Sequence, residues 1–194
     1  MRETPRHEEE LDQKPNPEAE ADFGKKQEHW NKLKKYFESK GIEEGIIKTI
    51  VGLNALGFQT YMSCEGQNKN STSNDVCVAP WVLIFPPEIP NSMSMTGSDL
   101  AKASSEREKK FMSDTKELLD KFYNKRKPTD VAKITLWQYT ERAWDHAVGI
   151  SNGSTTNPGN YINAEQLEMC QEEFDEFADF LEKKYYSKIK TGDN

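Results

Sequence analysis

The order of secondary structure in this chain turns on the stretch Leu53-Asn-Ala-Leu-Gly-Phe-Gln-Thr-Tyr-Met-Ser-Cys-Glu-Gly-Gln67. Apolar residues before it predict a central helix, and Gly57 predicts the end of that helix, because glycine readily adopts the left-handed conformation found there. The next residues, Phe58 to Ser63, predict a short strand. A Ser-Cys-Glu-Gly cluster is therefore delivered to the end of a strand, where a tight turn at Gly66 would expose its neighbours.

A second strand is predicted downstream, over Val78 to Phe85, with Trp81 near its start. It ends where three prolines follow, since proline cannot continue a sheet ladder. The uninterrupted polar run 67–75 between the two strands predicts a mobile loop. Two strands joined in this way would bring Trp81 beside the Ser-Cys-Glu-Gly cluster and frame a pocket.

The remaining elements are predicted from apolar periodicity and from capping, glycine and proline residues. The order helix, helix, strand, strand, helix, strand, strand, helix predicts an α+β fold, with a small mixed or antiparallel sheet flanked by helices. We expect a disordered acidic arm over residues 1–22, a single domain over 23–188 and a flexible end over 189–194. The other predicted elements are a helix before Gly41, a helix from Glu43 to Gly57, a helix from Thr96 or Ser98 to about Lys125, strands over Val131 to Tyr139 and Ala147 to Ser151, and a helix from Asn163.

Charge gives little indication of a partner. The chain has 194 residues and a net charge of −7, and the arm carries eight acidic and three basic residues, so the rest of the chain is close to neutral. A near-neutral body does not indicate nucleic-acid binding. The chain has no apolar leader and no run of membrane-spanning length, so we expect a soluble cytoplasmic protein with no membrane contact. Its three scattered cysteines are expected to be free thiols.

Cys64 is the candidate catalytic residue. A thiol attacks as the thiolate, which needs a nearby cation, an imidazole or the amides at a helix end. His146 is the predicted base, since His7 lies in the arm and His29 on a charged helix. The alternatives are that Cys64 is a structural thiol at a strand end or that it binds a ligand.

A metal site is not predicted. Cys64 and Cys77 lie thirteen residues apart, and neither belongs to a Cys-x-x-Cys pair or a similar pair of ligands. The common phosphate-loop, dinucleotide and hydrolase motifs do not occur in the sequence. The cofactor, if there is one, and the oligomeric state cannot be predicted.

The leading hypothesis is a ligand-binding or regulatory domain, with an enzyme second and an interaction module using the C-terminal helix third. The predicted ligand-binding residues are Ser63, Glu65, Gly66, Gln67 and Trp81. Aromatic residues on the predicted strands either pack in the core or form a stacking wall for a flat ligand. They are Trp81, Trp137, Tyr139 and Trp144, and Arg142 among them is a candidate for binding an anion.

Four short segments together form a pattern: Leu53-Asn-x-x-Gly57, Thr60, Ser63-Cys-Glu-Gly66 and Pro80-Trp-Val82. This pattern resembles that of a family of small uncharacterised bacterial proteins, Leu-Asn-x-x-Gly-x-x-Thr-x-x-Ser-Cys-Glu-Gly-His followed by Pro-Trp-Val. The resemblance implies no assigned activity. This chain has Gln67 where the family has histidine, and glutamine cannot act as an acid or base, although it can hydrogen-bond a ligand.

A shorter likeness involves Thr60 and Ser63-Cys64-x-Gly66 alone. These residues are similar to the Thr-x-Ser-Ser-Cys-Ser-Gly-Arg segment of the tRNA wybutosine-synthesis methyltransferases, which also lies where a helix feeds a strand. That likeness would imply S-adenosylmethionine and tRNA as ligands. The arginine of that segment is replaced by Gln67 here.

Overall fold

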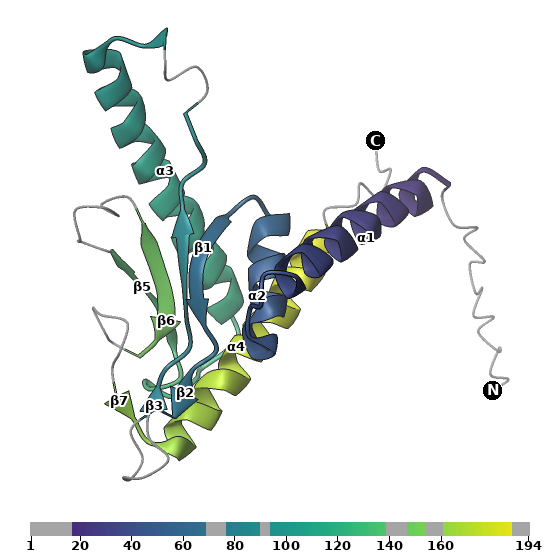
Figure 1. The fold of residues 1–194 in the computed structure, drawn as a ribbon, viewed down its shortest axis with the longest axis vertical. Helices are drawn as coiled ribbons and strands as arrows, with labels where there is room; N and C mark the ends of the chain where they lie inside the picture. The colour runs from purple at the N-terminus through teal and green to yellow at the C-terminus, as the bar shows by residue number, and fades with distance from the viewer. Residues whose placement is uncertain (1–16, 69–76, 90–93, 139–146, 154–160, 188–194) are drawn as a thin grey trace, which may run out of the picture.

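The computed structural model describes residues 17–68, 77–89, 94–138, 147–153 and 161–187 (Figure 1). This part of the chain forms an α+β fold in which helices flank an antiparallel sheet, as predicted. The helices are α1 (Pro17–Glu38), α2 (Glu44–Ala55), α3 (Gly97–Tyr123) and α4 (Ala164–Ser187). The strands are β1 (Gln59–Cys64), β2 (Gln67–Asn68), β3 (Cys77–Val78), β4 (Trp81–Phe85), β5 (Ile134–Gln138), β6 (Val148–Asn152) and β7 (Tyr161–Ile162).

The strands form two sheets. The larger has the order β1-β4-β6-β5, and all of its neighbours are antiparallel. The smaller has the order β2-β3-β7. The strand predicted over Val78 to Phe85 is divided between them, because Ala79 and Pro80 interrupt it and proline has no N–H for a ladder.

The core lies between the larger sheet and the helices. Side chains alternate along β4, so Val82 and Ile84 face the helices while Trp81, Leu83 and Phe85 face the other way. We call these the inner and outer faces of the sheet. Figure 1 shows α2, α4 and α1 stacked to one side of the sheet. The inner face packs against the apolar stripes of α2, α3 and α4, including Ile46, Ile50, Leu53, Phe111, Leu118, Phe122, Phe174, Phe177 and Leu181.

Helices α2 and α4 pack closely together at Gly52. A Cβ atom on Gly52 would lie 2.6 Å from Cβ of Leu181, so the two helices approach to a distance that only glycine permits.

In the described part of the chain no helix is both long and apolar enough to cross a bilayer.

Helix α1 begins before the predicted end of the N-terminal arm. It starts at Pro17, so residues 17–22 are helical where the sequence indicated disorder. Proline suits the first turn of a helix, whose N–H groups have no partner within the helix. Further along α1, Trp30 packs against Tyr185 of α4, and the Tyr185 hydroxyl lies 2.9 Å from Nδ1 of His29. Residues 1–16 and 188–194, which hold the rest of both predicted ends, lie outside the described residues.

The connection from α2 to β1 explains much of the sequence pattern around it. The Asn54 side-chain amide donates to the carbonyl of Ile50 and to the hydroxyl of Thr60, both at 2.8 Å. Gly57 has a φ of 95°, in the left-handed region that favours glycine. The pattern Leu-Asn-x-x-Gly-x-x-Thr thus encodes the end of a helix, a left-handed glycine that terminates it, and a strand whose threonine is hydrogen-bonded to the asparagine of the helix.

Candidate functional site

The Ser-Cys-Glu-Gly turn is bonded to the start of α2. An oxygen of the Glu65 carboxylate accepts the backbone N–H of Gly45 at 2.9 Å, and the N–H of Glu65 donates to the Glu43 carboxylate at 2.7 Å. The first N–H groups of a helix have no partner within it, so Glu65 caps α2 from a distance. A Cβ on Gly45 would lie 2.7 Å from that carboxylate oxygen, so the cap needs glycine at this position.

Gly66 is closely surrounded by its neighbours, and any other residue would be strained at this position. Its φ is 88°, and a Cβ there would lie 2.6 Å from Cδ1 of Leu167 and 2.9 Å from the backbone oxygen of Val78. The side-chain amide of Gln171 on α4 donates to the Glu65 carbonyl at 3.1 Å. The turn is therefore held from both sides by α2 and α4, which gives Glu65 and Gly66 structural roles.

Cys64 and Trp81 lie together on the outer face. They are cross-strand partners, and the same row continues to Ser151 on β6 and Thr135 on β5. Cys64 and Trp81 are half-buried, whereas Ser151 is 3% exposed. The Ser151 hydroxyl has no hydrogen-bond partner among the described residues. We call Cys64, Trp81, Ser151 and Thr135 the polar row.

The other predicted ligand-binding residues are placed elsewhere. Ser63 pairs with Val82, so its side chain is on the inner face rather than beside Cys64. The backbone of Gln67 pairs with Val78 in the smaller sheet. Of the predicted pocket residues, the outer face thus brings together Cys64 and Trp81. A role of the Gln67 side chain in binding stays a prediction.

The rest of the outer face is apolar. The Trp137 indole lies directly over Gly149, where an added Cβ would meet the ring at 1.8 Å, and packs with Leu83 and Ala147. At the β1 end a bulge between Thr60 and Met62 breaks the alternation, and Tyr61 packs edge-on against Phe85 on this same face. Tyr61 and Met62 are 62% and 47% exposed. Among the described residues, the apolar side chains that pack together around Trp137 come from the strands and from Ala147.

His146, the predicted partner of Cys64, lies outside the described residues, as do Tyr139, Arg142 and Trp144. None of the three cysteines forms a disulfide. Cys77 and Cys170 are fully buried, and burial raises the pKa of the Cys170 thiol to about 12, so Cys170 is a core residue as its place on the apolar stripe of α4 suggests. Within the described ranges, no group of three or more His, Cys, Asp or Glu side chains is arranged to hold a metal ion.

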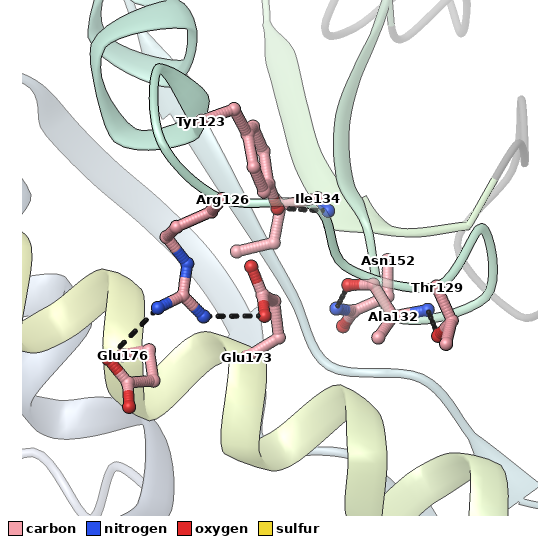
Figure 2. A network of polar contacts seen from close by, with 8 residues as sticks. All are labelled: Tyr123, Arg126, Thr129, Ala132, Ile134, Asn152, Glu173 and Glu176. Carbon is pink, nitrogen blue, oxygen red and sulfur yellow. Dashed lines mark hydrogen bonds and ion pairs between the residues drawn. The ribbon is translucent and has the colours of Figure 1, made fainter.

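A partly buried polar network joins the segment after α3 to α4 (Figure 2). Arg126 donates to Glu173 at 2.9 Å and to Glu176 at 3.2 Å, and the Glu173 side chain is only 8% exposed. The Tyr123 hydroxyl accepts the N–H of Ile134 at 2.7 Å, and burial raises its pKa. Because the Arg126 charge is compensated by two carboxylates, this network fixes the chain between α3 and β5.

Sequence reasoning did not identify this network. The signal that could have identified it is Glu173, which falls between Cys170 and Phe177 on the apolar stripe of α4. A carboxylate on a buried stripe needs a cation, since burying an unpaired charge is strongly unfavourable. Arg126, in the segment just after α3, supplies that cation.

Comparison of the chain with models of protein families, with curated proteins and with solved structures found no match.

Proposed function

We propose that this protein is a binding domain that takes up a small, flat ligand at the polar row. The observation that carries the proposal is the Ser151 hydroxyl, which is buried beside Trp81 without a hydrogen-bond partner among the described residues. A buried hydroxyl that lacks a partner destabilises a fold by roughly 1–3 kcal/mol. A polar group of a ligand that reached this hydroxyl would remove that penalty.

The neighbours of Ser151 supply the other contacts that such a ligand needs. The half-buried indole of Trp81 offers a surface for stacking, and Cys64 stands on its other side. Aromatic side chains continue along the face as Phe85 and Trp137. Because the chain outside the arm is nearly neutral, a small molecule suits this face better than a nucleic acid does.

A cysteine-dependent enzyme is the second candidate, because Cys64 lies half-buried on the outer face, unlike the two core thiols. The two candidates differ in the state of this thiol. If Cys64 is activated, the rate of its alkylation should stay high below pH ~7, whereas an ordinary thiol titrates near ~8.5. An ordinary profile, followed by mass spectrometry of each cysteine, would leave binding as its role.

The binding proposal is tested by a thermal-shift screen of a metabolite library against the full chain. A hit should bind Ser151→Ala about tenfold more weakly, a loss of about 1.4 kcal/mol, while the melting temperature of the unliganded variant stays unchanged or rises because the unpaired hydroxyl is gone. Ser105→Ala, on the exposed side of α3, is the control and should bind as the wild type does. The proposal fails if no compound raises the melting temperature, or if Ser151→Ala binds every hit as tightly as the control.

We also propose that the protein works in a reducing compartment such as the cytoplasm. The support for this is that none of its three cysteines forms a disulfide.

A further inference from the structure

A groove runs between helix α3 and the edge strand β5, and Thr135 is the one member of the polar row that also lines it. It encloses about 580 Å³. Its α3 wall carries Met112, Leu119 and Tyr123, and its β5 wall carries Ile134 and Leu136. The lining is predominantly apolar, which favours apolar side chains as its contents.

Strand β5 is an edge of the larger sheet, and two hydrogen bonds show which of its backbone groups point away from β6. The carbonyl of Lys133 accepts the N–H of Gly153, on the β6 side, at 2.9 Å. The N–H of Ile134 instead points away from β6 and donates to the Tyr123 hydroxyl at 2.7 Å. Backbone groups alternate in direction along a strand, so those of Leu136 and Gln138 also point away from β6.

Among the described strands, β5 pairs with β6 alone. Leu136 and Gln138 therefore present N–H and C=O groups that can pair with one more strand. An extended chain added there would place alternate side chains between β5 and α3, against Met112 and Leu119. Recognition of peptides by an added strand uses this combination of a sheet edge and pockets for every second side chain.

Charge at the rim favours a carboxylate at one end of such a strand. Lys116 is paired with Asp120 on α3. Lys133 has no ion pair among the described residues, and its ammonium lies 5.9 Å from the centre of the Tyr123 ring. Lys133 precedes β5, and antiparallel pairing would bring the C-terminal end of an added strand to it. A carboxylate at that end would complement the lysine.

We propose that the groove between α3 and β5 binds an extended segment of a partner protein, which joins the sheet as an antiparallel strand next to β5. The segment has apolar side chains at alternate positions, in contact with Met112, Leu119 and Leu136, and a carboxylate at its C-terminal end beside Lys133. This site shares Thr135 with the polar row but rests on other contacts, at Met112, Leu119 and Leu136, so either proposal can fail without the other.

The test begins with selection of displayed random heptapeptides on the full chain. Synthetic copies of the enriched peptides are then titrated against the wild type and variants by fluorescence anisotropy. We expect enriched sequences that alternate apolar and other residues and end in a carboxylate. Gln138→Pro removes an N–H that faces the open edge and no bond to β6, so affinity should fall about tenfold. Gln138→Ala, which loses the side chain but keeps the N–H, should bind like the wild type.

A second pair of variants tests the charge. Lys133→Glu should weaken binding at least fivefold, and Lys127→Glu, an exposed lysine that does not line the groove, should not. Circular dichroism confirms that each variant is folded. The proposal is overturned if no sequence pattern is enriched, or if Gln138→Pro and Gln138→Ala bind equally well. It is also overturned if light scattering shows a dimer that Gln138→Pro dissociates, because the occupant would then be a second copy of this chain.

Discussion

Replacing Gly66 with alanine tests whether the Ser-Cys-Glu-Gly turn is a folding element. Two penalties apply. A residue with a Cβ loses roughly 1–2 kcal/mol in the left-handed region, where Gly66 has a φ of 88°. The new Cβ would also lie 2.9 Å from the backbone oxygen of Val78 and 3.0 Å from Cδ of Pro80, neither of which is the end of a flexible chain. Overpacking of this kind costs about 1–3 kcal/mol. We therefore expect Gly66→Ala to lower the free energy of unfolding by about 3–4 kcal/mol.

Gly57→Ala is the matched control. Gly57 has a φ of 95°, but nothing lies within 4 Å of an added Cβ, so only the backbone penalty applies. Urea denaturation, followed by tryptophan fluorescence, measures both variants. The expected loss for Gly57→Ala is about 1–2 kcal/mol, which leaves a difference of roughly 2 kcal/mol for the steric contact. If the two variants differ by less than about 0.5 kcal/mol, Gly66 is not enclosed and the turn is free to serve a ligand.

Two further predictions concern the helices and the buried thiol. Gly52→Ala should lower the free energy of unfolding by about 1–3 kcal/mol, because its Cβ would meet Leu181 at 2.6 Å. Gly24→Ala in α1, with open space around it, should raise that free energy by about 0.5–1 kcal/mol. Equal effects in urea denaturation would contradict the close approach of α2 and α4. Because the pKa of Cys170 is raised in the folded chain, its thiol stays protonated there between pH ~8.5 and about 12, whereas the same thiol loses its proton in the unfolded chain. Stability should therefore fall as pH rises through that range. Parallel slopes for the wild type and Cys170→Ala above pH 9 would show that the thiol is not buried in this way.

Local signals in the sequence predicted the fold well. The helices and main strands follow from apolar spacing, and the end of α2 follows from Gly57. The division of the second strand was missed, although Pro80 is a signal for it, because the apolar run around it was taken as continuous. The start of α1 was placed six residues late, since residues 17–22 contain no large apolar side chain whose spacing would predict a helix.

The candidate site was harder to predict, because its residues meet through cross-strand register. Sequence adjacency suggested that Ser63, Cys64, Glu65 and Gly66 act together, yet the strand alternation and the cap on α2 direct them to different places. Trp81 was correctly placed near Cys64 from the order of the two strands. Ser151 could not be paired with either from the sequence, since the position of β6 beside β4 is set by packing across some seventy residues of chain.

The bulge in β1 bears on how this sheet could aggregate. Residues 58–64 contain no charged side chain, and an uncharged edge strand of this kind can template fibres. Fibre growth needs two regular edges on each molecule, so that every copy can receive the next. The bulge at Tyr61 interrupts and twists one edge of the larger sheet, which leaves β5 as the regular edge of that sheet. Two copies could join through β5, but the interrupted edge at β1 would hinder the addition of a third.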